Sequence, residues 1–447
     1  MSATATHSTV PEIRDAAPSL AATALGPMGL GVVLLVIAAA AGIGGGQVSR
    51  FWHAYLLGVS FITALSIGAL FFVIAHHLAG GRWATVIRRL AELMASAIPY
   101  CAALFIPIAA HILMTDSGAL YPWNDPTIVA GNELREHKSG YLSDGCFVIR
   151  MAIYFGVYTL LAKYFFGQSV AQDTSDPLAR AKMMGARSGP AMILFALATN
   201  FAAFDWLMSL EPTWFSSIFG VYFFAGSVVA YVSFMILMLN VLQGRGVLTQ
   251  SVTADHYHDK GKMLFGFIFF SGYIAFSQYM LIWYAAIPEE TQWYAIRQFG
   301  PWVNFSWFLL FGHLLIPFLG TMSRTVRRNK KLIGFWALWM LVMSAANLFY
   351  VIMPQADGVE VGNMMKHPLP LPWLEALCVV GALLVFSGAL VRNFTSSPCD
   401  VARDRRERRF TTEGIESTEG LINGLFRLRT LLGDLDHSLT LRKRPSS

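Results

Sequence analysis

One carboxylate, Asp205, lies inside an apolar stretch that begins after Pro190 and meets no other charge until Glu211. An ionised side chain at membrane depth costs roughly 2.5–3.5 kcal/mol or more, so it usually has a partner or a functional role. Arg150 lies six residues after Asp144 in another apolar stretch, and Asp205 lies six residues before Glu211. At about 1.5 Å per residue, both side chains lie roughly 9 Å below the ends of their helices. This common depth predicts an Arg–Asp ion pair that offsets much of the burial cost of both groups.

Other titratable side chains gather near the two ends of the same group of helices. His111 lies close to the end of its own apolar stretch, at the level expected for the ion pair. At the opposite ends, His76 and His77 close one apolar stretch and Glu92 opens the next. The sequence therefore places two layers of titratable groups at the two faces of the membrane.

Hydroxyl and amide groups lie between these two layers, among them Tyr100 and Asn200. Titratable groups at both faces, with such groups between them, are typical of a proton relay. The alternative is structural: Arg150 and Asp205 form only a buried ion pair, and the paired histidines only fill an interface. The residues by themselves leave both interpretations open.

The elements that must position these groups are membrane helices. Of the 447 residues 55% are hydrophobic and only 13% are charged, whereas soluble proteins carry about 25% charged residues. A membrane-spanning helix needs about 20 mainly apolar residues. The sequence therefore predicts an all-α polytopic membrane protein with ten transmembrane helices. These are residues 25–43, 51–78, 93–114, 145–166, 189–210, 214–243, 262–287, 298–323, 332–353 and 373–394.

The cationic residues orient these helices in the membrane. If the N-terminus lies in the cytoplasm, most of the 33 lysines and arginines fall on the inside, and ten spans return the C-terminus there. We expect a cytoplasmic disordered tail over residues 1–24 and a long external loop over 115–144, long enough to be functional or to dock a partner. We expect residues 395–447 to form a basic cytoplasmic tail, whose arginines suit anionic lipid and whose leucine spacing predicts an amphipathic helix.

The four cysteines lie far apart, at Cys101, Cys146, Cys378 and Cys399. The chain has no CxxC or CxxCH motif, which argues against covalent haem, iron–sulfur ligation or a zinc knuckle within it. Haem held by two histidines would need a pair at matching depth on facing helices, and no histidine pair is compelling. We expect no bound metal, and nothing in the distribution of basic residues indicates nucleic-acid binding.

The second half of the membrane region is poorer in titratable groups. No carboxylate lies well inside one of its spans. The polar side chains within these spans are four amides and one histidine: Asn240, Gln278, Asn304, His313 and Asn347. Amides commonly hold transmembrane helices together by interhelical hydrogen bonds. We therefore interpret these side chains as mainly structural.

Several long segments make the sequence similar to a known family. They are FWHAYLLGVSF (51–61), HHLAGGRWATVIRR (76–89), ALYPW (119–123), FDWLMSLEPTWFSSIFGVYFF (204–224) and AFSQYMLIWYAAIPEET (275–291). Through them the chain resembles the ActF membrane subunit of alternative complex III, a bacterial quinol:cytochrome c (or other acceptor) oxidoreductase. ActF is also called quinone-binding subunit 2 and is related to NrfD and the polysulfide reductase membrane subunit. The resemblance implies two four-helix bundles, residues 51–210 and 214–353, with the first and last helices at the periphery.

The resemblance also implies a function. The chain would be an integral subunit of a respiratory complex in the bacterial inner membrane, beside a sister NrfD-like subunit and periplasmic subunits that carry haem c and iron–sulfur clusters. His111, Arg150 and Asp205 would exchange protons or hold a quinone headgroup near the outer face. His76, His77 and Glu92 would admit protons at the inner face, with Tyr100 and Asn200 between. Two alternatives remain: a non-catalytic scaffold of the same complex, and a stand-alone transporter, which would show broken helices in matching halves.

Overall fold

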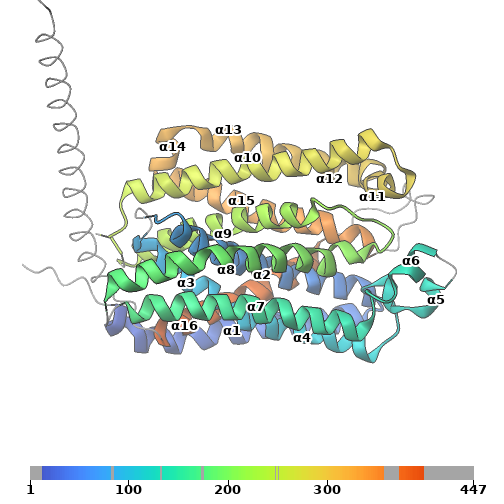
Figure 1. The fold of residues 1–447 in the computed structure, drawn as a ribbon, viewed down its shortest axis with the longest axis horizontal. Helices are drawn as coiled ribbons and strands as arrows, with labels where there is room; N and C mark the ends of the chain where they lie inside the picture. Colours follow the sequence, from blue (N-terminus) through green and yellow to red (C-terminus); the bar gives the residue numbers. More distant parts are fainter. Residues whose placement is uncertain are drawn as a thin grey trace, which may run out of the picture. The chain divides into compact units, whose positions relative to one another are not determined.

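The computed structural model describes residues 13–81, 85–130, 133–172, 176–246, 248–249, 251–356 and 372–396. Within this part the chain is helical with no β-strand, and ten helices are long and apolar enough to cross a membrane (Figure 1). The predicted all-α fold with ten membrane-spanning helices is confirmed. The helices run side by side, and the segment between residues 115 and 143 lies at one end, called here the loop end.

The first bundle contains four spans, of which one is broken into two helices. They are α2 (Val48–Leu78), α3 (Thr85–Ala95) with α4 (Ile98–Met114), α7 (Asp144–Ala171) and α8 (Pro177–Trp206). The second bundle also contains four spans. They are α9 (Phe219–Gly244), α10 (Ala254–Ala285), α12 (Trp302–Leu309) continued by η3 (Leu310–Leu315) and α13 (Ile316–Met322), and α15 (Lys330–Ile352).

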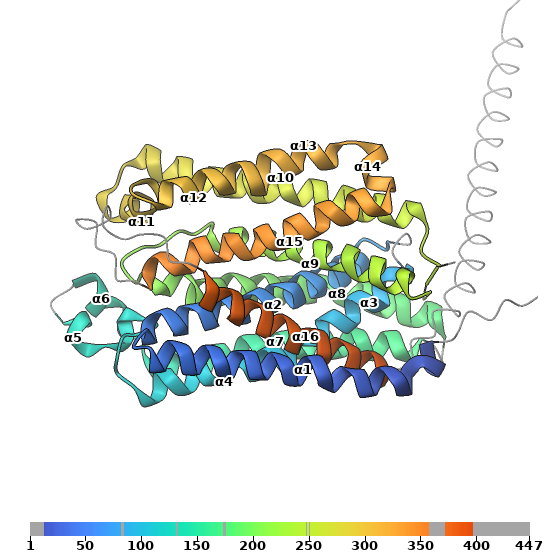
Figure 2. The ribbon, with the colours of Figure 1, turned by 180° about the vertical axis from the view of Figure 1, so that it is seen from behind.

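The first and last spans form a pair outside both bundles. Helices α1 (Ile13–Gly44) and α16 (Trp373–Ser396) pack along one another and against α2 (Figure 2). Helix α1 starts earlier than expected, because residues 13–24 of the expected tail are helical. Residues 1–12 and 397–447, and with them nearly all of the expected basic tail, lie outside the described residues.

Helix α2 is the central helix of the molecule. It packs against α8, α9 and α16, and almost every residue from Phe51 to His77 is buried. Two glycines permit this crowding, because a Cβ at Gly58 would lie 2.6 Å from the Cys378 carbonyl oxygen of α16. A Cβ at Gly68 would collide with the Ser227 carbonyl oxygen of α9. Small residues at such contacts let membrane helices approach closely and gain van der Waals contact.

The third span is broken into a shorter helix, α3, and a longer one, α4. Helix α3 ends at Ala95 and α4 begins at Ile98, with Ser96 and Ala97 in a turn. Pro99 occupies the first turn of α4, where its missing N–H costs nothing. The expected single helix over 93–114 is therefore two helices that change direction before the proline.

The eighth span contains one π-helical turn, η3. In a π turn the carbonyl of Gly312 would accept from residue 317, but Pro317 has no N–H. The Trp339 indole Nε1–H of α15 donates to that carbonyl at 2.7 Å instead. This irregular turn lies in the third span of its bundle, whereas the break between α3 and α4 lies in the second, so the two do not occupy matching positions.

The segment between α4 and α7 has structure of its own. It contains three short helices, η1 (Pro122–Asn124), α5 (Pro126–Val129) and α6 (Glu133–Lys138). The Tyr121 hydroxyl donates to the Trp206 carbonyl oxygen at 3.0 Å, and Lys138 Nζ donates to the Pro212 carbonyl oxygen at 2.6 Å. Partial burial lowers the pKa of Lys138, and nearby Glu211 opposes that shift. These bonds fasten the segment over the ends of α8 and the chain that follows it.

A buried arginine joins α11 (Pro288–Gln298) to the last turn of α15. Arg297 donates to the carbonyl oxygens of Trp293, Tyr350 and Val351 at 2.7, 3.1 and 2.9 Å. Its guanidinium lies 3.4 Å from the centre of the Trp293 ring. Burial lowers its pKa to about 10, so it stays charged at neutral pH. The cation satisfies carbonyls at a helix C-terminus, where they lack intrahelical partners.

The remaining short helices are η2 (Met208–Leu210), α14 (Arg324–Arg328) and η4 (Met353–Gln355).

The close approach of α2 and α9 gives a first prediction. Gly68→Ala should destabilise the protein by about 1–3 kcal/mol, because the added methyl meets rigid backbone of α9 and both helices must move apart. The measurement is the thermal unfolding midpoint of the purified full chain in detergent. Gly167→Ala on α7 is the matched control, since nothing lies within 4 Å of its added Cβ. Equal midpoints for the two variants would contradict the packing described here.

Candidate functional site

The predicted ion pair forms between α7 and α8. Arg150 Nε lies 2.7 Å from Asp205 Oδ2, and Arg150 Nη2 donates to Asp205 Oδ1 at 3.2 Å. Both carboxylate oxygens are therefore held by one guanidinium, the geometry that makes Arg–carboxylate pairs strong and directional. Asp205 is only 1% exposed, and the Arg150 side chain is 17% exposed.

The local structure explains why this carboxylate needs a cation. Asp205 lies in the last turn of α8, where the unpaired carbonyls make the helix end negative. The Ser209 hydroxyl donates to the Asp205 carbonyl oxygen and satisfies one of these groups. Arg150 supplies the positive charge that the helix end does not, and it does so from the loop end of α7.

Two tyrosines complete the surroundings of the pair. The Tyr154 hydroxyl, one turn along α7 from Arg150, donates to Asp205 Oδ2 at 2.6 Å. The ring of Tyr141 lies 3.7 Å from the Arg150 guanidinium, and its carbonyl oxygen accepts from Nη1 at 2.7 Å. Burial raises the pKa of the Tyr141 phenol, and the charge on Asp205 adds to that rise. Among the described residues, the buried Asp205 carboxylate thus accepts hydrogen bonds from the Arg150 guanidinium and the Tyr154 phenol, and Arg150 is the more exposed member of the ion pair.

His111 lies in a separate group at the loop end. Its ring stacks on Trp52 of α2 at 4.2 Å, and its Nδ1 lies 3.1 Å from the Thr115 hydroxyl. No hydrogen bond or ion pair joins it to Arg150 or Asp205 within the described residues. The common depth was sufficient to find the Arg–Asp pair, but it does not bring the histidine into contact with it.

The second predicted layer lies at the opposite end of the first bundle. The rings of His76 and His77 are 5.8 Å apart, and His77 stacks on Phe165 of α7 at 5.5 Å. Glu92 is fully buried and pairs with Arg88 at 3.2 Å and with Arg89 at 3.8 Å. The predicted histidines and the carboxylate thus share this end of the bundle, and two arginines from α3 neutralise the carboxylate.

A buried lysine, Lys260, reaches this layer from the second bundle. It is 0% exposed, its Nζ lies 3.3 Å from the Tyr231 hydroxyl of α9, and the centre of the Phe72 ring of α2 is 3.4 Å away. The ring of Phe72 is in turn 5.9 Å from that of His76. Lys260 was not among the candidate residues predicted from the sequence. The signal was available, because Lys260 lies on the same helical face as the buried Tyr257 and Leu264.

The groups between the two layers form a partial chain. The Tyr158 hydroxyl, one turn beyond Tyr154, donates to the Thr199 hydroxyl of α8 at 3.2 Å. Asn200 lies against Gly220 of α9, and Tyr100 is half-buried on α4. Neither of these predicted relay residues has a hydrogen bond to Tyr158 or Thr199 among the described contacts. On α7 the next buried residues, Leu161 and Ala162, are apolar.

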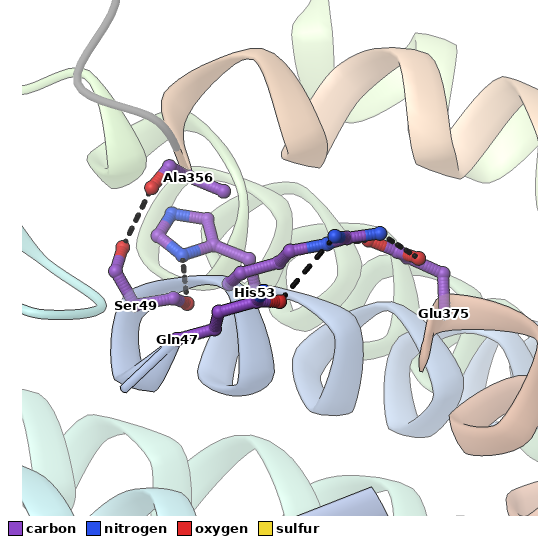
Figure 3. A network of polar contacts seen from close by, with 6 residues as sticks. Gln47, Ser49, His53, Ala356 and Glu375 are labelled. Carbon is purple, nitrogen blue, oxygen red and sulfur yellow. Dashed lines mark hydrogen bonds and ion pairs between the residues drawn. The ribbon is translucent and has the colours of Figure 1, made fainter. Parts of the chain in front are cut away.

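A third polar network lies at the loop end of α2 (Figure 3). Arg50 pairs with both carboxylate oxygens of the buried Glu375 of α16, at 2.9 and 3.1 Å. His53 Nδ1 lies 2.8 Å from the Ser49 carbonyl oxygen, and the Ser49 hydroxyl donates to the Ala356 carbonyl oxygen at 2.9 Å. Sequence reasoning missed this pair because each member stands near the end of a span, where a charge needs no partner.

Within the described residues no group of three or more His, Cys, Asp or Glu side chains is placed to hold a metal ion. No family model matches the sequence, and no curated protein is similar to it at a significant level.

The ion pair makes a second prediction, on stability. Arg150→Met should destabilise the chain by about 3–5 kcal/mol, because it leaves the Asp205 carboxylate buried without a cation. The double variant Arg150→Met/Asp205→Leu should be more stable than Arg150→Met alone, because it removes both charges. Unfolding midpoints of the wild type, both single variants and the double variant test this. Strictly additive effects would show that the pair contributes no coupling energy.

Proposed function

We propose that this chain is an integral membrane subunit of a respiratory quinol:cytochrome c (or other acceptor) oxidoreductase, to which it contributes a proton path. The path runs along the first bundle, from the ion pair at the loop end to the histidines at the opposite end. Haem c and iron–sulfur clusters belong to partner subunits in this proposal, as does a sister NrfD-like subunit. It places the chain in the bacterial inner membrane with both termini in the cytoplasm.

The observation that carries the proposal is the buried Asp205 carboxylate held between Arg150 and the Tyr154 hydroxyl. Oxidation of a quinol releases two protons, so a base near the outer face is chemically required in such a complex. A carboxylate that accepts a hydrogen bond from a phenol can take part in proton transfer at membrane depth. The ActF-like segment 204–224 contains this carboxylate, and its resemblance supports the same assignment.

The opposite end of the bundle supports a proton entry. His76 and His77 are titratable, and Glu92 with its two arginines lies on the adjoining helix. Tyr158 and Thr199 extend the path from the loop end toward the middle. The apolar residues Leu161 and Ala162 follow on α7. At this segment the side chains of α7 alone cannot carry a proton.

In this proposal, a quinone would bind only beside Arg150, at the loop end of the ion pair. Arg150 is the more exposed member of the pair, with 17% of its side chain exposed, and it lies at the loop end, so a headgroup oxygen could accept a hydrogen bond from it. His111, stacked on Trp52 at the same end, would be a second contact. Firm binding of quinone by this chain is not required for the proton path.

Two other functions compete with this one. A scaffold subunit is favoured by the completeness of the Arg150–Asp205 pair, which neutralises itself without any substrate. A stand-alone transporter is disfavoured, because the broken span and the π turn lie at non-matching positions of the two bundles. If the chain contributes a proton path, a conservative substitution at the ion pair should alter turnover. If the chain is only a scaffold, the same substitution should leave turnover unchanged.

The test uses the complex purified from native membranes through a tag on this chain. Haem c and iron–sulfur subunits should co-purify, and Tyr154→Phe should lower quinol oxidation roughly tenfold or more while the complex still assembles. The change removes one hydroxyl from Asp205 and leaves Arg150 in place. Tyr164→Phe is the matched control on the same helix, because that hydroxyl contacts Arg187 away from the pair. Its turnover should equal the wild type.

Two outcomes would overturn the proposal at different levels. Purification of the chain without any redox subunit would remove the respiratory assignment. Full turnover of Tyr154→Phe in an intact complex would leave the scaffold function in its place.

A further inference from the structure

A small cavity lies between the two bundles, near their loop end. It is enclosed by α2, α9 and α15, together with Leu207, and most of its walls are apolar. Four of its lining residues are polar: Tyr222 and Ser227 of α9, and Ser344 and Asn347 of α15. None of these residues belongs to the proton path described above.

The polar groups around the cavity can form further hydrogen bonds, one as a donor and two as acceptors. The Tyr222 hydroxyl donates to Asn347 Oδ1, which fixes the amide so that its Nδ2 faces the cavity beside Gly226. No further hydrogen bond to this Nδ2 occurs within the described part of the chain. The hydroxyls of Ser227 and Ser344 donate to carbonyls of their own helices, each at 2.8 Å, so their oxygens can still accept. The cavity thus offers one amide donor and two hydroxyl acceptors.

The size of the cavity selects the ligand. Counted for the centres of water molecules, its volume is about 20 Å³. One water needs roughly 10–15 Å³ on this measure and two to four polar partners, whereas a quinone ring or a lipid tail needs far more room. A purely apolar void of this size would stay dry, but this one has three groups that fit a water.

We propose that this cavity is a structural hydration site, in which an ordered water accepts from Asn347 Nδ2 and donates to the hydroxyls of Ser227 and Ser344. The water connects α9 to α15 and completes the hydrogen bonding of the Asn347 amide beside α2. Through Asn347, the water also links Tyr222 to both serines by hydrogen bonds. From the sequence alone, the amides of this bundle were expected only to form hydrogen bonds between helices. The proposal is independent of the respiratory function.

Gly226 provides a selective test, because a Cβ added there enters the cavity and its nearest neighbour is Asn347 Nδ2 at 3.9 Å. Gly226→Ala should therefore displace the water without a steric clash. Gly266→Ala on α10 is the matched control for the gain in helix propensity, since nothing lies within 4 Å of its added Cβ. The measurements are the thermal unfolding midpoints of the purified full chain and a high-resolution map of the wild type.

The unfolding midpoints of the two variants should differ. The control should raise the midpoint by about 1–2 °C, because alanine is the better helix former. Gly226→Ala should gain less than the control or lose stability, because its methyl group replaces a hydrogen-bonded water. The wild-type map should show a water within hydrogen-bond distance of Asn347 Nδ2. A rise for Gly226→Ala at least as large as the control, as expected for filling a dry void, would overturn the proposal, as would an empty cavity in a map that resolves other buried waters.

Discussion

A charge buried among apolar helices must have a partner, and the Arg150–Asp205 pair satisfies this constraint at the centre of the candidate site. The carboxylate stands at the negative end of α8, so its stability as an ion depends on a cation from the neighbouring helix. That requirement sets the register of α7 against α8. It also fixes Tyr154 one turn further along, and it holds Tyr141 of the preceding segment against the guanidinium.

The same constraint is met differently at other places in the fold. Glu375 is neutralised by one arginine from another helix. Glu92 is neutralised by two arginines from its own helix. Arg297 is surrounded by backbone carbonyls and an indole ring, and Lys260 by a phenol and a phenyl ring. Among the described residues, the buried carboxylates named here contact arginines, and these two buried cations contact carbonyls or aromatic faces. The carbonyl-bound Arg297 joins α11 to the last turn of α15.

Much of the fold could be predicted from the sequence, because membrane spans are defined by length and apolarity alone. The Arg150–Asp205 pair could be predicted as well, since both charges lie well inside their spans and counting residues gives their depth. Depth does not give the direction in which a side chain points, so His111 was expected beside a pair that it does not contact. Lys260 and Glu375 were overlooked because they lie near helix ends. The break before Pro99 and the π turn at Pro317 depend on local hydrogen bonding that apolarity does not reveal.

We propose that Asp205 binds and releases a proton as well as neutralising Arg150. The most direct measurement is the number of protons translocated or released per electron by the purified complex in liposomes, for the wild type and Asp205→Asn at matched turnover. The amide keeps the shape of the side chain and a hydrogen bond to Arg150 but cannot bind a proton as the carboxylate does. If Asp205 transfers protons, the ratio of protons to electrons should be lower in the variant; an unchanged ratio in an intact, fully assembled complex would contradict this role.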